Sequence, residues 1–179
     1  MPDIYQGTEF WDLSLVDPDN RRPIDFAARR SALESIDAAA PEKLLADWRT
    51  GQAKMRLLKA GLAFRRQKPE LFAEGGYVPL EAIGPDADRI VAFARRRGAD
   101  WLILVATRRA LPLLDGDLPL VPPARWSETK ILLPDEAQSL PLRDIVFGGD
   151  IAGGPALDAA NVLARFPVAL LHAGAESGR

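Results

Sequence analysis

The chain has 179 residues, 47% apolar and 27% charged, with 23 Lys and Arg against 25 Asp and Glu, one His and no Cys. The net charge of −2 disfavours a strongly basic nucleic-acid binder, and the lack of Cys excludes disulfides and thiolate metal sites. A single His excludes two-histidine zinc motifs, and a complete (β/α)8 barrel needs roughly 250 residues. We therefore expect one or two small domains without a metal ion or a cofactor.

The N-terminus lacks the basic and apolar regions of a signal peptide, and the longest apolar run covers only residues 101–106. A membrane span needs about 20 apolar residues. We therefore expect a cytoplasmic protein with no membrane partner. Arginines occur in short scattered runs, among them residues 29–30, which favours solvated faces over an anion site. We expect no nucleic-acid partner.

Residues 1–25 are polar and irregular, and they combine carboxylates, arginines and aromatic side chains in one segment. Asp-Pro-Asp-Asn at residues 17–20 is typical of a turn. Proteins hold sugars through paired hydrogen bonds from carboxylates and Arg, with aromatic rings against the apolar sugar face. Composition alone favours a plainer alternative, in which Asp25 caps a helix and Asp17 pairs with Arg21.

Three helices and one further helical turn are predicted from the spacing of apolar residues and the positions of proline. Their ranges are 25–37, 41–48, 51–67 and 70–72. The apolar residues that the first helix should bury are Phe26, Leu33 and Ile36. The third helix carries an apolar stripe formed by Met55, Leu58 and Leu62.

Beyond Gly75 the apolar pattern changes to that of strands. Strands are predicted at 77–83, 89–96, 101–107, 118–121, 129–133, 142–147 and 167–172. The segment 101–107 is apolar on both faces, so we expect it to be central, and 84–88 reads as a hairpin loop. The predicted fold class is therefore α+β, with a loop and helices over residues 1–75 and an antiparallel β-sandwich over residues 76–179.

Other residues with possible chemistry favour structural roles. His172 ends an apolar strand without an accompanying G-x-S-x-G motif, so we interpret it as structural. The glycine-rich stretch 148–154 lacks the spacing of a phosphate-binding loop and is expected to be a flexible loop. The three tryptophans expected to be core or half-buried residues rather than sugar platforms are Trp48, Trp101 and Trp126.

Residues 2–9 read Pro-Asp-Ile-Tyr-Gln-Gly-Thr-Glu. This string resembles the segment after the eighth barrel strand in the α-amylase family, where Pro-x-x-Tyr-x-Gly-x-Glu recurs. The continuation through residues 10–23, together with residues 64–72 and 163–171, resembles the maltooligosyl trehalose synthases, the (1→4)-α-D-glucan 1-α-D-glucosylmutases. The resemblance covers almost the whole chain and implies a C-terminal portion. The helices before residue 75 would then be a remnant of the end of the (β/α)8 barrel.

The resemblance implies an isomerase of trehalose biosynthesis that converts the reducing-end α-1,4 linkage of a maltooligosaccharide to α,α-1,1. Its reaction is retaining, with an Asp nucleophile and a Glu acid and base on earlier barrel strands. We therefore expect no catalytic residue in this chain and no mutase activity from it alone. The residues that the resemblance implies shape or line the glucan site are Tyr5, Glu9, Asp17, Asn20, Arg21 and Arg22. Of the two arginines, we expect one to face the site and the other to pair with a carboxylate.

The resemblance also implies the binding partners: a maltooligosaccharide, and the N-terminal catalytic barrel that this sequence lacks. Without that barrel, apolar helix faces such as Met55, Leu58 and Leu62 would drive self-association. An alternative function is a non-catalytic β-sandwich module that binds α-glucan or docks on a partner.

Overall fold

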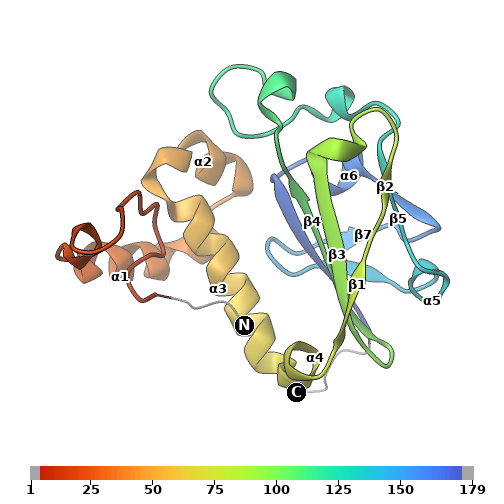
Figure 1. Ribbon diagram of the computed structural model, residues 1–179, viewed down its shortest axis with the longest axis horizontal. Helices are drawn as coiled ribbons and strands as arrows, with labels where there is room; N and C mark the ends of the chain where they lie inside the picture. Colours follow the sequence, from red (N-terminus) through yellow and green to blue (C-terminus); the bar gives the residue numbers. More distant parts are fainter. Residues whose placement is uncertain (1–4, 175–179) are drawn as a thin grey trace. The chain divides into compact units, whose positions relative to one another are not determined.

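A computed structural model of the protein describes residues 5–174 (Figure 1). The chain divides into two units, residues 1–59 and residues 60–179, with the division inside helix α3 (Gln52–Gln67). Helices dominate the red-to-yellow part of the chain and strands the green-to-blue part, which confirms the α+β class. The predicted domain boundary at residues 75–76 falls where helices give way to strands and stays a prediction.

The first unit is built from short helices whose ends follow from the sequence. They are η1 (Asp19–Arg21), α1 (Phe26–Ser35), η2 (Ile36–Ala38), α2 (Pro41–Ala46), η3 (Trp48–Thr50) and the first part of α3. Asp25 caps α1 as predicted, because its Oδ1 accepts a hydrogen bond from Ala28 N at 2.9 Å. Pro41 occupies the first position of α2, where its missing N–H costs nothing. Gly51 separates η3 from α3 with φ +81°, a conformation that favours glycine.

The predicted burial of α1 is wrong in part. Ile36 is buried, but Phe26 and Leu33 are 49% and 43% exposed. A unit of this size has too few elements to cover every face of each helix. Along the predicted apolar stripe of α3 the burial of the side chains decreases: Met55 is buried, Leu58 is half-buried and Leu62 is exposed.

The second unit contains the end of α3, helix α4 (Pro69–Ala73) and two antiparallel sheets. The larger sheet has the order β1-β3-β4-β9-β6-β7, and its strands are β1 (Gly76–Pro79), β3 (Ile90–Arg97), β4 (Asp100–Thr107), β9 (Val168–Ala173), β6 (Leu142–Asp144) and β7 (Asp150–Ile151). The smaller sheet has the order β2-β5-β8, formed by β2 (Ala82–Ile83), β5 (Lys130–Leu132) and β8 (Ala156–Asp158). Short helices connect the strands: η4 (Ala87–Arg89), η5 (Leu111–Leu113), η6 (Pro123–Trp126), α5 (Asp135–Gln138) and α6 (Ala159–Val162).

Both sheets contribute to one hydrophobic core. Ile103 on β4 and Leu171 on β9 lie opposite each other in register, and both are fully buried. Leu157 on β8 belongs to the same core. Trp101 and Trp126 are core residues as predicted, and β4 is central as predicted. The finer expectation of a β-sandwich stays a prediction.

Three predicted strand segments differ from the structure. The segment 77–83 is divided between β1 and β2, which belong to different sheets. Residues 118–121 form no strand, because neighbouring prolines lack the N–H needed for a ladder. Strand β6 ends at Asp144 rather than at residue 147, and part of the expected flexible loop 148–154 pairs with it as β7.

Candidate functional site

The loop before α1 and the start of that helix enclose a hollow of about 550 Å³ in the first unit, which we call the N-terminal hollow. Its lining combines aromatic rings, carboxylates, guanidinium groups and an amide. The residues that carry these groups are Tyr5, Trp11, Asp12, Asp17, Asn20, Arg21, Arg22, Asp25 and Arg29. Of the predicted site residues, all but Glu9 line the hollow, and residues 2–4 of the motif lie outside the described residues. The roles of the predicted site residues in binding stay predictions.

Arg29, on the first turns of α1, holds the loop in place and was not singled out by the sequence. Its Nε donates to Gly7 O at 2.9 Å and lies 3.1 Å from Glu9 Oε2. Its guanidinium also lies 4.9 Å from the centre of the Phe10 ring. Only 18% of the side chain is exposed. The structure therefore differs from the expectation that residues 29–30 form only a solvated face.

Glu9 acts through these contacts rather than by lining the hollow. Its Oε1 accepts a hydrogen bond from Gly7 N at 3.1 Å. Burial pushes the pKa of Glu9 upward, but the hydrogen bonds from Gly7 and Arg29 outweigh burial and hold that pKa below its usual value. Glu9 is therefore ionised at neutral pH and braces the loop as a carboxylate.

Arg21 and Arg22 both pair with carboxylates in their own turn. Arg21 Nη2 donates to Asp17 Oδ2 at 3.0 Å. This is the ion pair expected if the segment has a structural role rather than a sugar-binding one. Arg22 pairs with Asp19, whose Oδ2 also accepts from Leu15 N at 2.9 Å. The expectation that only one arginine pairs is wrong in this respect, since both pair and both line the hollow. Exposed pairs of this kind are weak, so each guanidinium can exchange its partner for a hydroxyl group.

Trp11 attaches the same loop to η3. Its Nε1 donates to the carbonyl of Trp48 at 2.6 Å, and the two indole rings meet edge to face at 6.4 Å. Lys54 Nζ donates to Phe10 O at 3.0 Å. Gly51 lies so close to Phe10 that an added Cβ would come within 2.7 Å of the Phe10 backbone. Contacts between distant segments thus shape the hollow.

Two observations concern the described residues as a whole. Within residues 5–174, no helix is both long enough and apolar enough to cross a bilayer. Over the same range, no three His, Asp or Glu side chains are grouped as ligands of a metal ion.

Comparison with known proteins identifies the class of enzyme of which this chain resembles a part. No protein-family model matches the chain. Proteins of two Mycobacterium tuberculosis strains, both named as maltooligosyl trehalose synthases, are 39% identical over 171 residues and 96% of this chain. The maltooligosyltrehalose synthase from Arthrobacter ramosus superposes with a TM-score of 0.72 and 37% identity over 97% of this chain. A mutant of that enzyme gives 0.74 and 38%.

The chain thus corresponds to the C-terminal portion of the maltooligosyl trehalose synthases. It spans only 18% of the length of the curated relatives and 20% of the Arthrobacter chain.

Proposed function

We propose that the chain supplies the C-terminal portion of a maltooligosyl trehalose synthase. This enzyme isomerises the reducing-end α-1,4 linkage of a maltooligosaccharide to α,α-1,1. The observation that carries the proposal is the identity of 39% across nearly the whole chain to proteins of that name. The cytoplasmic location expected from the sequence stays a prediction.

The N-terminal hollow is the part of the chain that we propose to contact the maltooligosaccharide. Sugar hydroxyls both donate and accept, and the hollow offers both kinds of partner: Asp17 accepts, whereas Arg21 and Arg22 donate. The ring of Tyr5 is largely exposed and available to pack on a sugar face. Glu9 serves indirectly, through Arg29.

We propose that the chain alone is catalytically incomplete. A retaining glycoside mechanism needs one carboxyl group with a raised pKa as general acid. Hydrogen bonds from Ser14 lower the pKa of Asp12, and the pKa of Glu9 is lowered as well. Asp25 is occupied as the cap of α1. None of these three carboxylates therefore suits the role of general acid, and we assign the nucleophile and the acid to the larger portion of the enzyme.

The same proposal names a protein partner for the first unit. Leu13, Leu15 and Val16 are 92%, 77% and 83% exposed and follow one another closely in the loop. Apolar side chains so exposed mark contact surfaces. We propose that the larger portion, which the relatives possess beyond the segment matched here, packs against them. The sequence predicts self-association of the isolated chain through the helix face of Met55, Leu58 and Leu62. Because Met55 is buried, we propose the loop surface in its place.

A fusion protein tests the proposed function. The C-terminal fifth of the Arthrobacter enzyme is replaced by this chain, and formation of a non-reducing product from maltopentaose is assayed. We expect activity from the fusion and none from the truncated enzyme or from this chain alone. A folded but inactive fusion, or turnover by the isolated chain, would contradict the proposal.

The exposed apolar residues favour a second candidate function, a non-catalytic docking or glucan-binding module. Calorimetric titration with maltooligosaccharides distinguishes a glucan-binding module from a docking module. Heat that is abolished by Asp17→Ala and Arg21→Ala indicates glucan binding, whereas no heat at millimolar sugar leaves only docking.

A further inference from the structure

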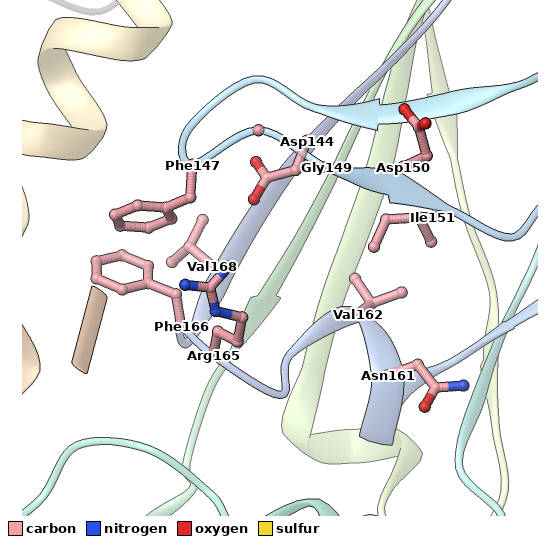
Figure 2. Close-up of a pocket in the computed structure, with 11 residues that line it drawn as sticks. Asp144, Phe147, Gly149, Asp150, Ile151, Asn161, Val162, Arg165, Phe166 and Val168 are labelled. Carbon is pink, nitrogen blue, oxygen red and sulfur yellow. The ribbon is translucent and has the colours of Figure 1, made fainter. Parts of the chain in front are cut away.

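A second pocket, of about 190 Å³, lies in the sheet-containing unit and belongs to no site discussed so far (Figure 2). It lies between the turn that joins β6 to β7 and the segment that leads from α6 into β9. We call it the β6–β7 pocket. It shares no residue with the N-terminal hollow.

One part of its wall is apolar. Ile151 on β7 and Val162 on α6 point toward each other across the pocket. At one end the rings of Phe147 and Phe166 lie 5.0 Å apart with an interplanar angle of 59° (Figure 2). Val168 completes this surface. The pocket therefore offers aliphatic and aromatic faces to a ligand.

The remaining wall is polar and carries both hydrogen-bond acceptors and hydrogen-bond donors. Asp144 is fixed in orientation, because its Oδ1 accepts from Val146 N at 2.8 Å and its N–H donates to Gly149 O at 2.9 Å. Arg165 places its guanidinium beside Val168 (Figure 2). Asp150, which pairs with Arg143 at 3.6 Å, lies at the periphery. A carboxylate accepts hydrogen bonds and a guanidinium donates them, so the wall suits a ligand that does both.

Two glycines form part of the turn beside the pocket. Gly148 and Gly149 have φ of +75° and +102°, and a Cβ added at either would meet no atom within 4 Å. The turn is therefore open on that side, and because both glycines line the pocket, the NMR signals of their amides can report a bound molecule.

Size and charge narrow the class of ligand. Pockets for drug-sized molecules occupy about 300–1,000 Å³, so a smaller pocket suits a single ring. An anion would be opposed by Asp144 and Asp150, and a cation by Arg165. A neutral ring with hydroxyl groups and an apolar face satisfies both parts of the wall.

We propose that the β6–β7 pocket binds one pyranose ring, as a sugar subsite separate from the N-terminal hollow. The choice of a glucan residue as its source rests on the proposed function. A free hexose and a disaccharide present the same chemistry, so the experiment compares them.

The test records amide spectra of the ¹⁵N-labelled protein by NMR during titration with glucose, maltotriose and trehalose in separate arms. We expect saturable shifts of the Gly148, Gly149 and Val162 amides at millimolar sugar, largest with maltotriose. Arg165→Gln and Asp144→Asn should each weaken this binding by about tenfold. Asn can still accept from Val146 N, so the turn is retained. Arg125→Gln is the matched control, because Arg125 pairs with Asp115 in an exposed loop outside the pocket.

The spectra also report whether each variant is folded. Absence of saturable shifts in these amides with all three sugars would overturn the proposal, as would shifts that persist unchanged in both pocket variants. Response to glucose or trehalose but not to maltotriose would retain the pyranose site and reject a glucan source. Shifts confined to residues 5–29 would support the proposed function and reject this subsite.

Discussion

Lys68 Nζ lies 3.1 Å from Oδ1 of Asp100, so the residue that follows α3 is paired with the first residue of β4. His172 Nε2 on β9 lies 3.3 Å from the same oxygen, and Phe64 on α3 packs on the His172 ring with centroids 4.9 Å apart. The backbone at residue 174 lies close to the Asp100 carboxylate. Only glycine fits there, because an added Cβ would collide with that carboxylate. The corner between α3 and α4 is thereby tied to the larger sheet.

Asp100→Asn is expected to destabilise the second unit by about 1–3 kcal/mol at neutral pH, because it removes the charge that two donors share. Burial raises the pKa of Asp100, but the hydrogen bonds from Lys68 and His172 outweigh it and leave the pKa below the usual 3.8. A carboxyl group whose pKa is lowered by folding stabilises the folded state at pH values above its unfolded-state pKa. That contribution is lost as the pH falls through the folded-state pKa.

Urea unfolding at about pH 7 and about pH 3 measures this effect. The deficit of Asp100→Asn should shrink at the lower pH. Asp115→Asn is the control, because Asp115 pairs with Arg125 at the same 3.1 Å in an exposed position. An equal deficit for Asp100→Asn at both values would show that its charge is unimportant.

Arg29→Gln is expected to loosen the loop around Glu9, whereas Arg30→Gln at the exposed neighbouring position should have little effect. Combined with Glu9→Gln, a double-mutant cycle should give a coupling of about 1 kcal/mol, since Glu9 is partly exposed. Thermal unfolding followed by circular dichroism measures each corner of the cycle. Additive losses would show that the 3.1 Å contact does not brace the loop.

Gly51→Ala is expected to destabilise the first unit more than Gly116→Ala destabilises the second. Both glycines have positive φ, +81° and +68°, which costs an alanine about 1–2 kcal/mol. Only at Gly51 does the new Cβ also meet the Phe10 backbone, whereas at Gly116 it meets nothing within 4 Å. The difference between the two variants in chemical denaturation therefore isolates this contact, and equal losses would argue against it.

Local signals explain which parts of the structure the sequence could predict. Asp25 as a cap, Pro41 at a helix start and the apolar segment of β4 each depend on neighbouring residues, and each is confirmed. Arg29 could not be recognised, because its partners lie about 20 residues away and no local spacing connects them. The predicted burial of Phe26 is wrong for a related reason, since apolar periodicity does not show whether another element covers that face of the helix.

Leu13→Ser combined with Val16→Ser is expected to reduce self-association of the isolated chain. Wild-type protein should elute as dimers or larger species and bind a hydrophobic dye, because these side chains are exposed. Size-exclusion chromatography with light scattering measures the effect, with Leu118→Ser in the second unit as the control. A monomeric wild type that binds no dye would exclude the proposed contact surface.

Calorimetric titration of the purified chain with maltopentaose tests most directly whether the N-terminal hollow binds sugar without catalysis. The account predicts saturable binding at millimolar maltopentaose, which Asp17→Ala and Arg21→Ala abolish and Arg125→Ala leaves unchanged. It also predicts that the solution recovered from the calorimeter contains no non-reducing product. Binding that is indifferent to Asp17 and Arg21, or maltopentaose consumed during the titration, would contradict it.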